Sequence, residues 1–480
     1  MQGFKITRMT TAERSAASPL PLDIFEALQA SVRGGLPRAI AELSDLVRIP
    51  SVSWDGFDSA HVEASANLTA ELLRALAVFD DVIVDRAPGP DGVLGQPAVL
   101  ARRAPSVGQP TVLLYAHHDV QPPGDDSAWT SPPFEPTLRG DRLYARGVAD
   151  DKAGVMAHVA AIRALLETSG APELGLVVFI EGEEEFGSRS FGALLERHRE
   201  LLEADVIVVA DSDNWAVDTP SLTVGLRGNA TFSLTVSTLD HASHSGMYGG
   251  AVPDAMLATI RLLATLHDDD GSVAVAGMRS HEQQVPSISE ERLRDEAALL
   301  EGVTPIGRGE LLHRLWAQPS ITVTGIDAPS VQNASNTLAP SITVKISARV
   351  APGQSAAEAF AALEHHLRDH APFGAHLSFG SIDLGEPFLV DATGWAVDEA
   401  IAAMTQSWGA DPVLAGVGGS IPFIAQLAET FPDAQVLVTG VEDPHTRAHS
   451  PDESLHLGVF QRAVLTEAVL LTRIQQHRVH

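Results

Sequence analysis

Residues 174–188 read LGLVVFIEGEEEFGS, in which an aliphatic run passes directly into four carboxylates and a glycine turn. The run that ends at Ile180 is typical of a strand buried on both faces, as in a sheet covered by helices. Glu181, Glu183, Glu184 and Glu185 repel one another, so a positive partner is expected beside them. The stretch therefore predicts a buried strand with a cation site at its end.

Three further short apolar runs resemble this strand, at residues 111–115, 205–210 and 435–439. Residues 152–167 lie between the first two strands and have the spacing of a helix, and several helices are expected before residue 80. Apolar strands that alternate with helices predict an α/β fold with a mostly parallel sheet sandwiched by helices.

The pattern changes near residue 227, where strands with one polar face alternate with two helices. This is typical of a small α+β domain inserted into a larger one. We therefore expect a loose N-terminal segment at 1–21, a main domain formed by 22–226 and 387–480, and an inserted domain at 227–386.

The composition of the 480 residues excludes several classes of function. The formal net charge of −30 opposes binding to nucleic acids or anionic membranes. The absence of cysteine excludes disulfides and thiolate metal sites. Neither a signal peptide nor a run of about 18 apolar residues is evident, so we expect a cytoplasmic protein with small ligands.

Polar side chains follow each predicted strand of the main domain. They are His117 and Asp119, then Glu184 and Glu185, then Asp211, and finally His449, while Asp150 precedes the helix at 152–167. Ligands of open α/β sheets bind beyond the carboxyl ends of the strands. Histidines and carboxylates without thiolates suit Zn²⁺, Mn²⁺ or Co²⁺, and a shared carboxylate can bridge two ions about 3.5–4 Å apart.

Each of these residues also has an ordinary structural explanation. Asp150 is placed to favour the start of a helix, and the acidic turn at 181–185 could simply be solvated. His118 is expected to point away from His117, because adjacent residues at a strand end face opposite sides. The inference rests on the repeated placement of such residues at strand ends.

The segments YAHHDVQP, ARGVADDKAG, EGEEEFGS, VVADSDNW and TRAHSPDE resemble, in order and spacing, the motifs of the M20 family of dinuclear metallopeptidases. The dipeptidase branch, with its carnosinase-like and PepV-like enzymes, is the most similar, and the resemblance extends from residue 22 to the C-terminus. It implies a zinc-exopeptidase-like fold with an inserted lid and dimerisation domain, and a homodimer formed through that domain.

The resemblance also implies roles for the residues at the strand ends. His117 and Asp211 would bind one ion, Glu185 and His449 the other, and Asp150 both. The two divalent ions are expected to be zinc, with manganese or cobalt as alternatives.

Two more residues have implied roles in the reaction. Asp119 would orient His117 through the second ring nitrogen, and a cis peptide bond would follow Asp150. Glu184 would act as the general base that takes a proton from water held between the ions, which gives a bridging hydroxide, and would then protonate the departing amine.

Further candidates come from the rest of the chain. His244, in the HSG motif, would support the oxyanion, in dimeric relatives across the subunit interface. Arg349 would bind a C-terminal carboxylate through two hydrogen bonds. The remaining substrate-binding candidates are Asn336, Gly418, Gly419 and Ser420.

The sequence thus predicts metal-dependent hydrolysis of dipeptides or very short peptides. An N-acyl-amino-acid deacylase of the same family is the first alternative, because amide hydrolysis beside a carboxylate requires the same groups. A catalytically silent binding protein is the second. It is disfavoured because such a protein has no need for a base beside two metal sites.

Overall fold

The computed structural model describes residues 18–390, 392–418 and 422–479, which form two compact units. The first unit comprises Met1–Leu222, Asp391–Leu414 and Thr430–His480, and the second comprises Thr223–Val390 and Ala415–Glu429. Residues 415–429, which the sequence assigned to the main domain, thus group with the inserted segment. Among the described residues, no helix is both long enough and apolar enough to cross a membrane.

The first unit contributes β1, β2, β6, β3, β7 and β17, in this order, to a nine-stranded sheet that continues through β8 (Ser221–Leu226) and β15 (Phe388–Leu389). The strands are β1 (Asp81–Asp85), β2 (Ala98–Arg103), β3 (Thr111–His117), β6 (Gly175–Glu181), β7 (Val206–Val209) and β17 (Gln435–Val438). Strands β6, β3, β7 and β17 run parallel to one another, whereas β2 is antiparallel to β6 and β1 is antiparallel to β2. The predicted α/β fold is confirmed, with a mixed sheet whose centre is parallel.

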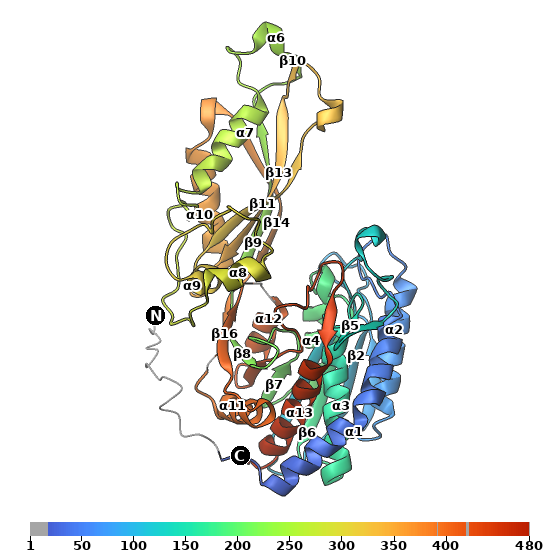
Figure 1. Cartoon of the computed structure of the whole chain (residues 1–480). Coiled ribbons are helices and arrows are strands. Elements are labelled where there is room, and N and C mark those ends of the chain that lie inside the picture. The colour runs from blue at the N-terminus through green and yellow to red at the C-terminus, as the bar shows by residue number, and fades with distance from the viewer. Residues whose placement is uncertain (1–17, 391, 419–421, 480) are drawn as a thin grey trace. The chain divides into compact units, whose positions relative to one another are not determined.

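Helices cover this sheet and explain its apolar sequence. Helices α1 (Leu22–Val47), α3 (Lys152–Ser169), α11 (Trp395–Trp408) and α13 (Leu457–Ile474) pack on one another, and α3 also packs on β3 (Figure 1). Helix α2 (Ser59–Arg74) packs on β1 and β2. Every residue of β3 and β6 is buried as a result.

Smaller elements complete the first unit. A three-stranded sheet has the order β18 (Ser454–His456), β5 (Arg142–Tyr144), β4 (Thr137–Arg139), and α4 (Phe191–Arg197) and α5 (Arg199–Leu202) follow β6 along the chain. This small sheet joins the segment before α3 to the segment before α13, and both segments carry candidate site residues.

The second unit is built on an antiparallel sheet with the order β11 (Ser320–Asp327), β13 (Ser341–Val350), β9 (Gly228–Ser237), β14 (His376–Gly385). Alternate residues of β9 and β13 are buried, as in a sheet with one covered face. Helices α7 (Ala255–Leu263) and α10 (Ala356–Asp369) pack on this sheet, and Phe232 and Ile346 lie in the shared core.

Short elements surround this sheet. They are β10 (Ser243–His244), α6 (Ser245–Tyr248), α8 (Glu290–Glu296), α9 (Leu311–Trp316), β12 (Thr337–Leu338), β15 (Phe388–Leu389) and α12 (Pro422–Thr430). Strands β8 (Ser221–Leu226) and β16 (Val413–Val417) pair with each other, and the boundary between the units passes through both.

Candidate dinuclear metal centre

The carboxyl ends of the parallel strands deliver the candidate residues to one edge of the sheet. His117 is the last residue of β3, and Asp211 follows β7. Glu184 and Glu185 begin a single 3₁₀ turn directly after β6. Parallel strands end at the same edge, so residues distant in sequence meet there.

The ligand atoms of all five predicted metal-binding residues lie together in two groups that share Asp150. His117, Asp150 and Asp211 form one group, Asp150, Glu185 and His449 form the other, and within each group the atoms lie within 4.8 Å of one another. This donor set of imidazole nitrogens and carboxylate oxygens fits divalent ions such as zinc, manganese or cobalt. The ligand roles themselves stay predictions.

The carboxylate of Asp150 faces one histidine with each oxygen. Its Oδ1 lies 3.1 Å from His117 Nε2, and its Oδ2 lies 2.9 Å from His449 Nε2. His449 Nε2 is also 3.3 Å from Glu185 Oε2. A carboxylate with its two oxygens directed to two separate ligand groups has the arrangement that a bridge between two ions requires. The peptide bond from Asp150 to Asp151 is cis, as the resemblance implied.

The site buries an excess of negative charge. Burial raises the pKa values of Glu184 and Glu185 well above the usual range, and nearby carboxylates add to the effect. Burial likewise raises the pKa of Asp211 to about 6. Burial also acts to raise the pKa of Asp150, but hydrogen bonds from two histidines outweigh it and hold that pKa below its usual value. Bound cations would relieve this repulsion.

Asp119 joins the end of β3 to the acidic turn. Its carboxylate accepts hydrogen bonds from Ser53 Oγ at 2.6 Å and from the backbone N–H groups of Glu184 and Glu185, each at 3.1 Å. His117 Nδ1 lies 3.1 Å from the backbone oxygen of Asp119 and 3.4 Å from Oδ1. The nearest acceptor for His117 Nδ1 is therefore the backbone oxygen of Asp119. The carboxylate of Asp119 chiefly holds the turn that carries Glu184.

The two other glutamates of the acidic stretch have structural partners. The hydroxyl of Tyr115 donates to Glu181 Oε2 at 2.6 Å, and burial raises the pKa of Glu181 to about 8. Glu183 accepts from the backbone N–H and the hydroxyl of Ser190 and from the N–H of Gln96. Only half of the acidic cluster therefore belongs to the candidate site.

His118 and Gln121 follow β3 closely in the sequence, and they have different partners. His118 is buried, with Nε2 2.8 Å from Pro97 O, and it points away from the site as expected. Gln121 Nε2 donates to Glu185 Oε2 at 2.6 Å, and sequence reasoning missed this contact. Gln121 lies in the motif YAHHDVQP, but only the fold shows that it reaches the acidic turn.

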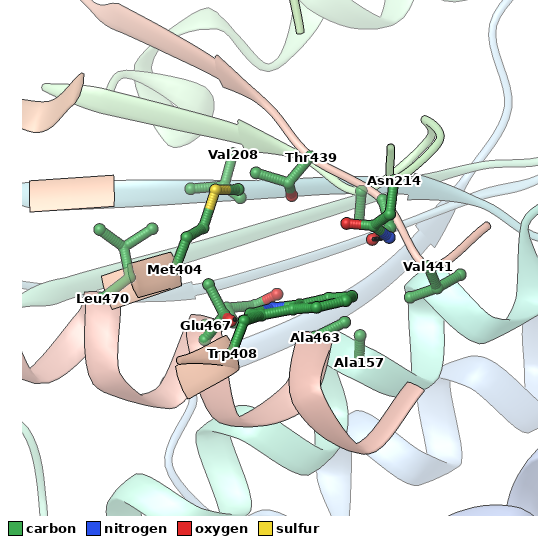
Figure 2. Close-up of a pocket in the computed structure, with 13 residues that line it drawn as sticks. Ala157, Val208, Asn214, Met404, Trp408, Thr439, Val441, Ala463, Glu467 and Leu470 are labelled. Atoms are coloured by element: carbon green, nitrogen blue, oxygen red, sulfur yellow. Dashed lines mark hydrogen bonds between the residues drawn. The ribbon is translucent and has the colours of Figure 1, made fainter. Parts of the chain in front are cut away.

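A small hollow in the first unit is distinct from this site. It has room for about one water molecule, with about 20 Å³ of free space. Figure 2 shows Met404, Trp408 and Glu467 lying opposite Val208 and Thr439. This space is too small for a peptide.

Further candidates lie in the second unit, and they fall into two groups. His244 pairs with Thr337 across β10 and β12, and the N–H of Ser245 donates to the backbone oxygen of Asn336 at 2.9 Å. Arg349 lies near the far end of β13, where it pairs with Asn229. His244 and Asn336 therefore lie close together, apart from Arg349.

The length of β13 separates these two groups. Ser341, at the end near β12, pairs with Ser237, and Arg349 follows eight residues later. At about 3.3 Å per residue, these two positions are about 26 Å apart. In one chain, His244 thus lies near the Ser341 end of β13, through the pairing of β10 with β12, whereas Arg349 lies near the other end.

A second arginine lies beside Arg349. Burial, and to a smaller extent the charge of Arg349, lower the pKa of Arg227 to about 10. Arg227 Nε donates to the backbone oxygen of Gly418 at 3.2 Å. The pair of guanidinium groups makes this end of the unit suitable for binding an anion. The GLRG motif alone had assigned no role to Arg227. The candidates Gly419 and Ser420 lie outside the described residues.

The comparisons agree with this geometry. The model of peptidase family M20/M25/M40 matches residues 113–473. A cysteinylglycine-S-conjugate dipeptidase of Corynebacterium striatum is 35% identical over 90% of this chain and 95% of its own. A Beta-Ala-His dipeptidase of Rattus norvegicus is 27% identical over 84% of this chain and 87% of its own.

Solved structures show the same fold. The dipeptidase Dug1p of Saccharomyces cerevisiae superposes with a TM-score of 0.82 at 22% identity, covering 94% of this chain and 98% of that one. Human carnosine dipeptidase 1 gives a TM-score of 0.80 at 22% identity, over 96% and 100% of the two chains. With its matching motifs, its site geometry and these relatives, the chain belongs to peptidase family M20/M25/M40.

Proposed function

We propose that this protein is a metal-dependent dipeptidase that hydrolyses the peptide bond of dipeptides or very short peptides. The main supporting observation is that two groups of ligand atoms share the carboxylate of Asp150 and that Glu184 lies beside them. The names of the relatives, which include dipeptidases for cysteinylglycine conjugates and for Beta-Ala-His, support this class of substrate.

Two divalent ions would be held at this centre. His117 and Asp211 would bind one, Glu185 and His449 the other, and Asp150 both. Such ions, when bound, polarise a substrate carbonyl and make a water molecule acidic near neutral pH. Zinc is the proposed metal, and manganese or cobalt suits the same nitrogen and oxygen donors.

Glu184 is the proposed general base. Its Oε2 lies 3.9 Å from His117 Nε2, and its side chain is 17% exposed, so it adjoins the centre and still reaches solvent. It takes a proton from the attacking water and then delivers that proton to the departing amine, as carboxylates do in general acid–base catalysis. Asp119 holds this base by accepting a hydrogen bond from its backbone N–H.

Substrate binding is assigned to the second unit, which we propose to be a lid and dimerisation domain at residues 227–386. Arg349, together with Arg227, would bind the C-terminal carboxylate of the peptide, beside Gly418. The first unit would then be the catalytic domain.

Either His244 or Arg349 must then come from a second copy of the chain, and we propose that it is His244. An extended dipeptide spans about 7 Å, whereas the two ends of β13 are about 26 Å apart. The His244 and Arg349 side chains of one chain thus cannot contact the same dipeptide. We propose a homodimer in which His244 and Asn336 of one copy complete the site of the other.

Replacing Glu184 with glutamine tests the assignment of the base. The variant should bind two ions per chain as the wild type does, and its turnover of dipeptides should fall by about 10²–10⁴-fold. Metal content and activity are measured on the same preparation, with Glu181→Gln as the matched control, because Glu181 pairs with Tyr115. Near-normal turnover of Glu184→Gln would reject the assignment.

A substrate panel separates the two catalytic alternatives. Dipeptides and N-acetyl amino acids with the same C-terminal residue are compared by kcat/KM. A dipeptidase should favour the dipeptides, whereas preference for the N-acetyl compounds identifies a deacylase. Bound metal without hydrolysis of either class identifies a silent binding protein.

A further inference from the structure

Glu453 is a fully buried carboxylate that receives four hydrogen bonds. Oε2 accepts from Arg146 Nη1 and from the N–H of Gly147, each at 2.8 Å. Oε1 accepts from the N–H groups of Ala149 at 3.0 Å and Asp150 at 3.2 Å. One side chain thus holds the whole turn that ends at the shared carboxylate of the candidate centre.

The same residue is fixed to the segment that carries His449. Glu453 directly precedes β18, and its backbone oxygen accepts from the N–H of Ala145 at 3.1 Å. Three residues of this segment have positive φ angles, which residues other than glycine rarely adopt. They are Arg447 at +59°, His449 at +61° and Asp452 at +59°. A loop with three such residues needs support from its surroundings.

Asp452 provides part of this support. It accepts hydrogen bonds from the N–H of Thr130 at 3.0 Å, from the hydroxyl of Thr130 at 2.6 Å and from Arg139 Nη2 at 3.0 Å. Glu453 provides further support, because its side chain accepts hydrogen bonds from the turn that leads to Asp150.

We infer that Glu453 is a positioning residue of the dinuclear centre, which fixes the place of Asp150 relative to His449. The inference rests on the proposed metal site, and Glu453 acts through backbone N–H groups without contacting metal or substrate. The contact that it would maintain is the 2.9 Å approach of Asp150 Oδ2 to His449 Nε2.

Glutamine cannot replace this carboxylate. All four partners are donors, and they are divided between the two oxygens. An amide has one oxygen, so its NH₂ group must face two donors in either orientation and leave them unpaired. The backbone from Gly147 to Asp150 should therefore shift, and the bridging position should shift with it.

A purely structural role is the competing explanation, because Arg146 and Glu453 also form a buried ion pair. Glu399 offers a matched control. It accepts from Arg473 Nε at 2.6 Å, lies 2.9 Å from His477 Nε2, and belongs to α11, which carries none of the candidate ligands. Glu399→Gln should therefore cost stability without altering the centre.

The experiment compares Glu453→Gln, Glu399→Gln and the wild type in the full-length protein. Affinities for Co²⁺ are measured by titration, and the Co²⁺ absorption spectrum at saturation reports the ligand geometry. Glu453→Gln should bind Co²⁺ about 10–100-fold more weakly and show an altered spectrum, as changes around metal ligands usually do. High metal concentration should restore part of its kcat with little change in KM.

Glu399→Gln should keep the wild-type affinity and spectrum, whatever its melting temperature. Wild-type affinity and an unchanged spectrum in Glu453→Gln overturn the inference, even if that variant melts earlier. If Glu453→Gln does not fold, Arg146→Lys, which keeps a cation beside Glu453, should show a smaller change in the same direction. Failure of the wild type to bind two ions would instead reject the proposed metal site itself.

Discussion

The substitution Asp119→Asn tests most directly whether Asp119 positions Glu184, the proposed general base. The native carboxylate accepts three hydrogen bonds, one on Oδ1 from the N–H of Glu184 and two on Oδ2 from Ser53 and Glu185. An asparagine loses least when its NH₂ replaces Oδ1, which leaves the partly buried N–H of Glu184 without an acceptor. An unpaired buried donor costs about 1–3 kcal/mol. If this free-energy cost adds to the activation barrier, kcat falls by about 5–150-fold.

The assay is steady-state dipeptide hydrolysis with saturating metal, together with the metal content and the melting temperature. Ser53→Ala is the control, because it removes one of the three donors and leaves the carboxylate beside Glu184. We expect Asp119→Asn to lower kcat much more than Ser53→Ala does. A fully metallated Asp119→Asn with kcat within two-fold of the wild type would refute the role given to Asp119.

Three more predictions follow from other contacts. Burial alone would lower the pKa of His158, but Glu467 at 2.9 Å and the backbone oxygen of Tyr115 at 2.9 Å raise it above the usual value of about 6.5. The stabilising effect of this pair is thus complete below about pH 6.5 and is lost as pH rises through the folded-state pKa. His158→Gln should lower the free energy of unfolding by about 3–5 kcal/mol at low pH. In urea unfolding, a loss of the same size at pH 5.5 and at pH 9 contradicts this. Removal of metal by a chelator should lower the melting temperature, because each ion at 100 times its Kd contributes about 2.7 kcal/mol; an unchanged melting curve argues against a buried acidic site that needs cations. Mixing the inactive variants His244→Ala and Glu184→Gln should restore activity as heterodimers form, and no recovery after verified subunit exchange would exclude action across a dimer.

The sequence was informative where a short local pattern determines position. Apolar runs followed by polar residues located the strand ends, and the ligand atoms of His117 and His449 do meet there at Asp150. Within the acidic turn the pattern failed, because the chain leaves the strand for a 3₁₀ turn and loses its two-residue alternation. The different roles expected of Glu183 and Glu184 therefore came from the family resemblance and not from the local pattern.

Contacts between distant segments were beyond the reach of one sequence. Nothing local to Glu453 shows that it holds the turn before Asp150, which lies 303 residues earlier. Residues 415–429 group with the second unit through tertiary contacts rather than through chain order. The separation of His244 from Arg349 depends on the strand pairing of β13, which composition does not reveal.

The shared aspartate has a consequence for biosynthesis. His117, Asp150 and Asp211 emerge early from the ribosome, whereas β17 and His449 are made much later. Until then β7 lacks one of its neighbours in the sheet, and Asp150 has only one of its two histidines. A nascent chain therefore contains the first group of proposed ligands before the second, so the proposed centre stays incomplete until the late segment is made.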